Sequence, residues 1–156
     1  MLALMSSALQ LVLRPAGMFL ASGTVSVMIG AIGIISMNSG RAILPGVLTP
    51  LILIGGGGIL LLFSAAHYLV AKLSSVEMSR ALAAITLGIV LVGMGFYFAS
   101  ARSMEAALDS AAPTGDAVVR QMIRSELCGV VAVTAFVFNV VIALRKRRSA
   151  TGVSPS

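Results

Sequence analysis

The sequence has few of the residues on which redox, metal and soluble-domain chemistry depends. Among its 156 residues there is no tryptophan, one cysteine and one histidine, and only 10% are charged. The single cysteine, Cys128, excludes a disulfide within the chain and any CxxC redox or zinc motif. The single histidine, His67, excludes a bis-histidine haem site within the chain. We therefore expect no cofactor and no catalytic, cofactor-binding or metal-binding residues.

The low charge also excludes an ordinary soluble domain, since globular domains carry about 25% charged residues. Here 58% of the residues are hydrophobic and the mean hydropathy is +1.06. A soluble domain of about 150 residues still exposes about a third of its unfolded surface, so it could not hide this much apolar area. We therefore expect the apolar surface of this chain to face lipid. The net charge of +6 does not indicate nucleic-acid binding, because the basic residues lie at the ends of apolar runs rather than in a patch with aromatics.

Four apolar runs are present, at residues 17–37, 51–70, 81–101 and 127–144, and none contains Asp, Glu, Lys or Arg. A hydrocarbon core of about 30 Å needs about 20 helical residues. A membrane β-barrel would instead show segments of about 10 residues that alternate apolar and polar side chains, which these runs lack. The sequence predicts an all-α integral membrane protein, a bundle of four transmembrane helices.

The distribution of Lys and Arg predicts that both termini are cytoplasmic. That topology places seven basic residues inside, namely Arg14, Lys72, Arg80, Arg145, Lys146, Arg147 and Arg148, and four outside, namely Arg41, Arg102, Arg120 and Arg124. The reverse topology would leave the "RKRR" segment outside. Together with a composition rich in Ala and Gly and with more Arg than Lys, this favours the inner membrane of a bacterium.

The connections between the runs differ. Pro45, Gly46 and Pro50 mark a short outer turn, with Pro50 expected at the first position of the second helix. Residues 102–126 form an outer loop that Pro113 and Gly115 divide into two short helical stretches. Its second part, 116–126, reads as an extension of the fourth helix.

An apolar stripe on that extension, formed by Val119, Met122, Ile123 and Leu127, would lie on the membrane surface or against a partner. Residues 1–15 are expected to form an interfacial segment that ends at Pro15. They lack the basic start of a secretory signal. Residues 146–156 are expected to form a basic and then disordered cytoplasmic tail.

The run 51–70 contains four consecutive glycines, Gly55, Gly56, Gly57 and Gly58. In lipid a helix tolerates these glycines, because an unfolded backbone would leave peptide groups unpaired at a cost of several kcal/mol each. Glycine instead lets a neighbouring backbone or a bulky side chain come close. Two interpretations stay open: close packing against two neighbours at once, or a flexible point or backbone-lined cavity used by a ligand or a gate.

The other helices also carry small residues at packing spacings. Ser22, Ser26 and Gly30 lie four apart on the first helix. Ala81, Gly88 and Gly95 lie seven apart on the third, with Ala84 on the same side. Ala135, Asn139 and Ala143 lie four apart on the fourth. Because lipid gives helices no hydrophobic reason to associate, such seams predict packing within the bundle or between bundles.

Few polar groups lie inside the runs. His67 stands near the inner boundary, so we expect a neutral, hydrogen-bonded interfacial histidine, or otherwise a polar intramembrane site. A proton relay would need a second titratable group at membrane depth, which the runs do not contain. We expect Asn139 to form a hydrogen bond to another helix, worth about 0.6 kcal/mol or more. Arg145, Lys146, Arg147 and Arg148 fix the topology or recognise anionic lipid heads.

The stretch "LPGVLTPLILIGGGGILLL", residues 44–62, resembles the small four-helix membrane subunit of tripartite tricarboxylate transporters. Those subunits carry a Gly-Pro-Gly-aromatic-aromatic-Pro motif at the corresponding place. Here Pro45, Gly46 and Pro50 align with it, the aromatics are absent, and the spacing is one residue longer. The resemblance covers about 40 residues and implies a transport role.

The leading hypothesis is a non-catalytic subunit, scaffold or assembly factor of a larger membrane complex, with lipid and other membrane subunits or its own copies as partners and no nucleic acid. The alternative is a small transporter or channel subunit, oligomeric, in which the second helix with Gly55–Gly58 lines a path. The sequence shows no nucleophile–base pair, so we expect no enzyme.

Overall fold

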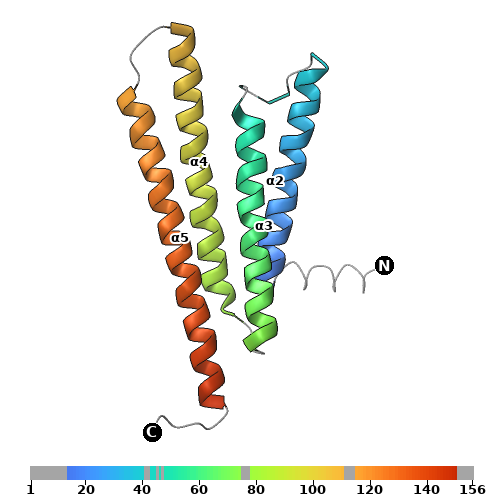
Figure 1. Cartoon of the computed structure of the whole chain (residues 1–156), viewed down its shortest axis with the longest axis vertical. Coiled ribbons are helices and arrows are strands. Elements are labelled where there is room, and N and C mark those ends of the chain that lie inside the picture. The colour runs from blue at the N-terminus through green and yellow to red at the C-terminus, as the bar shows by residue number, and fades with distance from the viewer. Residues whose placement is uncertain are drawn as a thin grey trace.

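The computed structural model describes residues 14–40, 43–44, 46, 48–74, 78–110 and 115–150, without the side chains of 107–110 and 150. These residues form four α-helices (Figure 1): α2 (Pro15–Asn38), α3 (Leu48–Ser74), α4 (Arg80–Ser110) and α5 (Gly115–Ala150). No strand occurs among the described residues. The predicted all-α fold is therefore confirmed.

Each of the four helices is long and apolar enough to cross a membrane, with a mean hydropathy of 2.0 to 2.6 over its most apolar window. The chain is thus a multi-pass membrane protein built as a four-helix bundle. Four antiparallel spans bring the start of α2 and the end of α5 to the same side of the bundle (Figure 1). That this side is the cytoplasm stays a prediction.

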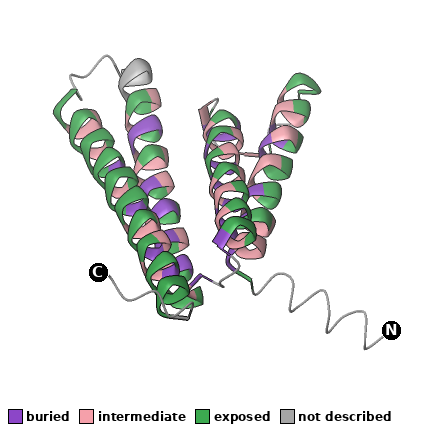
Figure 2. Ribbon diagram, turned by 60° about the horizontal axis from the view of Figure 1, so that its bottom comes forward, coloured by how far each residue is buried: buried purple, intermediate pink, exposed green. Residues whose placement is uncertain are grey.

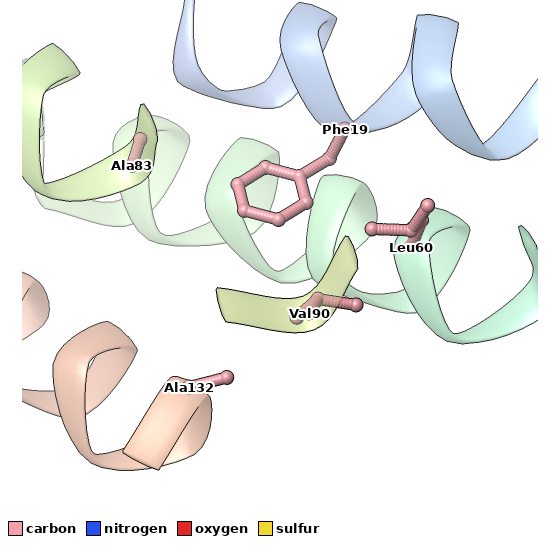
Figure 3. Close-up of a cluster of buried hydrophobic side chains, with 5 residues drawn as sticks. All are labelled: Phe19, Leu60, Ala83, Val90 and Ala132. Atoms are coloured by element: carbon pink, nitrogen blue, oxygen red, sulfur yellow. The ribbon is translucent and has the colours of Figure 1, made fainter. Parts of the chain in front are cut away.

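The bundle consists of two hairpins. Helix α2 packs closely against α3, and α4 against α5, whereas contacts between the two pairs are fewer. Figure 2 shows the buried residues on the facing sides of each pair, and the two pairs diverge toward one end. A small apolar core joins them: Phe19 from α2, Leu60 from α3, Ala83 and Val90 from α4, and Ala132 from α5 (Figure 3).

Proline and glycine set the ends of the first hairpin. Pro15 is the first residue of α2, where its missing N–H costs nothing. After α2, Gly40 adopts a φ of 73°, and its N–H donates to the carbonyl of Met37 at 3.0 Å. This is the left-handed glycine that commonly ends a helix. Pro50 lies in the first turn of α3, two residues after its start at Leu48, and the first four N–H groups of a helix have no intrahelical partner.

The helices are longer than the apolar runs. The segment 102–126, expected as an outer loop of two short helices, is mostly helical continuation: α4 extends through Ser110 and α5 begins at Gly115. The expected extension of the fourth helix through 116–126 is confirmed. Helix α5 also continues to Ala150, so it includes the basic segment and the first two residues of the stretch 149–156 that was expected to be disordered. Residues 1–13, 111–114 and 151–156, and with them Pro113, lie outside the described residues.

Candidate functional site

Glycines form the interface between α2 and α3. A Cβ built on Gly23 would lie 2.9 Å from the carbonyl oxygen of Gly57, and one built on Gly57 would lie 2.8 Å from the carbonyl oxygen of Gly23. Both distances are shorter than a real Cβ contact. The two backbones touch at this point, so neither position accepts a side chain without a shift of a helix.

The same interface continues toward the end of the hairpin where α2 is connected to α3. A Cβ on Gly30 would lie 2.7 Å from the carbonyl oxygen of Pro50, and a Cβ on Gly33 would collide with the side chain of Leu44. At the opposite end, Ser64 Oγ donates to the carbonyl of Ala16 at 2.8 Å. Small residues and one hydroxyl therefore contribute to the interface between α2 and α3 at several levels.

The four consecutive glycines differ in their surroundings. Gly57 faces α2, and Gly56 faces Met94 on α4, whose side chain a Cβ would overlap. These two glycines pack against two neighbours at once. Gly55 and Gly58, in contrast, would place a Cβ in open space. The packing interpretation thus accounts for the two buried glycines, but not for Gly55 or Gly58.

Most of the other predicted packing residues are less buried than Gly56 and Gly57. Gly30 is buried, whereas Ser22 and Ser26 are half-buried beside the Gly23–Gly30 line. On α4, the predicted seam of Ala81, Ala84, Gly88 and Gly95 is exposed. A Cβ on Gly88 or Gly95 would meet nothing within 4 Å. The seam on α4 faces away from the other helices, so its packing role stays a prediction about another molecule.

The contacts between α4 and α5 fix the register of the second hairpin. Ser125 Oγ donates to the carbonyl of Gly93 at 3.0 Å, and Ser100 Oγ donates to the carbonyl of Val118 at 3.5 Å. The residues 118–125 therefore lie beside 93–100, which belongs to the apolar run 81–101. The apolar run of α5, residues 127–144, is displaced toward the other end of α4.

This register brings charged residues of α5 beside the apolar run of α4, which the sequence did not reveal. Gly93 lies eight residues from the end of the apolar run at Ala101, which corresponds to about 12 Å along a helix at about 1.5 Å per residue. Glu126, the neighbour of Ser125, lies at that level. The serine hydrogen bonds hold α5 shifted against α4, so the apolar runs of these two helices do not stand level. That no second titratable group lies at membrane depth stays a prediction.

Arg124 shares this level but points elsewhere. Its guanidinium carbon lies 5.8 Å from the ring centroid of Phe96 on α4, a cation–π contact that helps to accommodate the charge. Glu126 is exposed, and within the described chain it has neither a hydrogen bond nor an ion pair.

A partly open cavity of about 700 Å³ lies between the hairpins, and we call it the inter-hairpin groove. Its walls are residues of α3 from Leu48 to Phe63, of α4 from Val90 to Met104, and of α5 from Val118 to Val133. Almost all of these side chains are apolar, and Glu126 is the single charged residue among the lining residues in the described chain. Gly55 lines the groove, as does Gly129 on α5, whose Cβ would also meet nothing within 4 Å. The missing side chains of these two glycines keep the groove open.

His67 lies in an aromatic cluster beside the groove. It is 1% exposed, and its ring stacks on Phe19 at 4.7 Å and meets Phe136 edge-on at 4.8 Å between centroids. Nδ1 and the carbonyl oxygen of Phe63 are 2.8 Å apart, and since a carbonyl only accepts, Nδ1 carries the proton. Nε2 is buried without a hydrogen-bond partner. His67 therefore joins α2, α3 and α5 by packing, and its depth in the bilayer stays a prediction.

Two polar side chains of α5 form hydrogen bonds at the end of the bundle where α3 ends and α4 begins. Asn139 is fully buried and hydrogen-bonds to the backbone of Ser79, the residue before α4. Its partner is thus a connector backbone rather than a second helix. Arg147 donates from Nη1 to the carbonyl of Leu73 near the end of α3, at 3.1 Å. Arg145, Lys146 and Arg148 are likewise exposed, and their roles in topology or lipid binding stay predictions.

At the opposite end, Glu105 connects the hairpins. Its Oε1 accepts the N–H of Leu48 at 3.1 Å, at the start of α3. A carboxylate is favourable there because the N-terminus of a helix carries partial positive charge. Gly46, with a φ of 78°, lies so close that a Cβ would overlap this carboxylate. The outer turn therefore needs glycine at this position.

Several residues important to the site were not predicted from the sequence, namely Gly23, Gly33, Gly93, Glu105, Glu126 and Gly129. For Gly23 a signal existed, since it precedes Gly30 by seven residues, the spacing that indicated Gly88 and Gly95. For Glu105 and Glu126 none existed, because their surroundings depend on the register of α4 against α3 and α5.

Comparisons of the chain with protein-family models, with curated proteins and with solved structures find no match. The resemblance of residues 44–62 to a transporter subunit thus gains no support from them.

Proposed function

We propose that this protein is a non-catalytic membrane subunit that holds an apolar molecule in the inter-hairpin groove as part of a larger transport complex. The observation that carries the proposal is the use of glycine along the groove. Gly55 and Gly129 line it and meet no other helix, although every other residue except proline favours a helix more than glycine does. Their lack of a side chain creates space rather than a helix contact.

The size of the groove supports a small ligand. Its volume of about 700 Å³ falls within the range of about 300–1,000 Å³ that is typical of ligand pockets. The lining residues on each helix extend over about 22 Å at about 1.5 Å per residue. The groove is therefore elongated, and its shape suits a single chain-like molecule.

The test uses an apolar photoreactive probe, dodecanol with a diazirine group, on the protein in phosphatidylcholine nanodiscs. We expect labelling of groove residues in the wild type and loss of that labelling in Gly55→Leu and Gly129→Leu. Gly58→Leu is the matched control, because a Cβ on Gly58 also meets open space but this glycine does not line the groove. Equal labelling of all four proteins would reject the groove as a binding site.

A second candidate function is that of a scaffold or assembly factor, and the exposed seam on α4 favours it. Gly88 and Gly95 have the spacing of a packing seam yet meet nothing within the described chain. If another subunit or copy covers this face, the double variant Gly88→Leu/Gly95→Leu should reduce the particle size after extraction in mild detergent. Gly58→Leu again serves as the control. A wild type that is strictly monomeric and without partners would count against this candidate.

We further propose that the protein resides in the inner membrane of a bacterium with both termini in the cytoplasm. The seven basic residues near one side against four near the other support this topology. In a Cys128→Ser background, Ser149→Cys should be protected from an impermeant maleimide in intact spheroplasts and should react after lysis. Reaction in intact spheroplasts would reverse the topology.

A further inference from the structure

We propose that the ligand of the inter-hairpin groove is an organic cation with one apolar chain, bound through Glu126. This inference rests on the proposed function and adds the chemical class of the ligand. It starts from the composition of the groove, in which one carboxylate stands among apolar walls.

The position of Glu126 makes its negative charge important for binding a ligand. The contact of Ser125 with Gly93 places Glu126 beside the apolar run of α4, about 12 Å from the end of that run at Ala101 at about 1.5 Å per residue. A charged group in apolar surroundings normally pairs with another group or marks a substrate pathway. Glu126 has no such partner within the described chain. A cationic ligand supplies the missing partner.

The basic residue nearest to Glu126 in the sequence does not take that role. Arg124 precedes Glu126 by two residues, so the two side chains lie on different sides of α5. Its guanidinium lies over Phe96, and neither Arg124 nor Phe96 lines the groove. The groove therefore presents a negative charge that no lining residue balances.

The other lining residues fit the same ligand class. Tyr97 lines the groove and is 42% exposed, and an aromatic ring attracts an ammonium group through its negative face. The hydroxyls of Ser100 and Ser125, by contrast, already donate to backbone carbonyls. The elongated shape of the groove suits one chain. An alkylammonium ion combines these properties: a single apolar chain and one positive charge.

The experiment compares two photoreactive probes of equal chain length, dodecyltrimethylammonium and dodecanol, each with a diazirine group, on the full chain in phosphatidylcholine nanodiscs. In the wild type we expect the ammonium probe to label groove residues more strongly than the alcohol. Glu126→Gln should reduce labelling by the ammonium probe about tenfold, equivalent to about 1.4 kcal/mol, and leave labelling by the alcohol unchanged.

Two further variants make the result specific. Asp116→Asn removes a carboxylate from α5 that does not line the groove, and it should leave both probes unaffected. Glu126→Asp keeps the charge, and it should retain most of the labelling by the ammonium probe. Circular dichroism and size-exclusion profiles equal to those of the wild type establish that each variant is folded.

The outcomes separate this inference from the proposed function. If Glu126→Gln leaves labelling by the ammonium probe unchanged while the alcohol still labels the groove, the cation is rejected and the apolar groove remains. If Asp116→Asn lowers the labelling as much as Glu126→Gln, the effect is general surface charge, and the cation is again rejected. If neither probe labels the groove in the wild type, both proposals fail.

Discussion

The side-chain amide of Asn139 on α5 forms two hydrogen bonds with the backbone of one residue, Ser79. The N–H of Ser79 donates to Oδ1 at 2.9 Å, and Nδ2 donates to the carbonyl of Ser79 at 3.1 Å. The same carbonyl accepts the N–H of Ala83 at 3.0 Å. One buried side chain therefore fixes the start of α4, where the connector from α3 arrives.

Asn139→Leu should destabilise the junction of the two hairpins. The substitution removes both bonds and leaves the N–H of Ser79 without that acceptor, which costs about 1–3 kcal/mol. Unfolding in SDS, followed by circular dichroism, measures the change. Asn38→Leu is the matched control, because Asn38 is exposed at the end of α2. Equal unfolding midpoints for the two variants would contradict the role of Asn139.

Two adjacent glycines should respond in opposite ways to a methyl group. A Cβ on Gly57 would lie 2.8 Å from the carbonyl oxygen of Gly23, whereas a Cβ on Gly58 meets open space. We expect Gly57→Ala to destabilise the protein by about 1–3 kcal/mol through overpacking. Gly58→Ala should be neutral or stabilising by up to about 1 kcal/mol through helix propensity. The same SDS titration distinguishes them, and similar destabilisation of both would disprove a specific contact with α2.

The four spans could be predicted from the sequence because they depend on a local property. A run of about 20 apolar residues without charge specifies a transmembrane helix whatever its neighbours are. The helix ends were predicted less well. Most of the segment 102–126, which was expected to be an outer loop, belongs to α4 and α5. Only Pro113 and Gly115 in this segment disfavour a helix, and hydropathy alone does not mark where a helix ends.

The groove could be predicted only in part. The run of four glycines indicated either packing or a cavity, and both occur: Gly56 and Gly57 pack, and Gly55 lines the groove. The position of Glu126 beside the apolar run of α4 could not be predicted, because it follows from the hydrogen bond between Ser125 and Gly93, which are 32 residues apart. Register between helices is a tertiary property that no apolar run encodes.

His67 should tolerate phenylalanine better than alanine. Its ring packs between Phe19 and Phe136, and its buried Nε2 has no hydrogen-bond partner. His67→Phe retains the aromatic volume and removes the unpaired nitrogen, so we expect little change in stability. His67→Ala leaves a cavity and should cost about 2–5 kcal/mol. SDS unfolding of both variants checks the order. A loss with His67→Phe as large as with His67→Ala would show that the ring nitrogens, rather than the ring, are needed.

Glu105 should control how far the hairpins separate at the outer end. Its Oε1 accepts the N–H of Leu48, and such a charge-assisted bond is worth about 1.5–3 kcal/mol. Glu105→Ala removes the acceptor and should let α3 move away from α4, whereas Glu105→Gln keeps an oxygen in place. Spin labels on Ser39→Cys and Arg120→Cys, in a Cys128→Ser background, report the separation by double electron–electron resonance. We expect a longer and broader distance distribution for Glu105→Ala and a nearly unchanged one for Glu105→Gln. Identical distributions for Glu105→Ala and the wild type would mean that the apolar core at Phe19, Leu60 and Val90 holds the hairpins by itself.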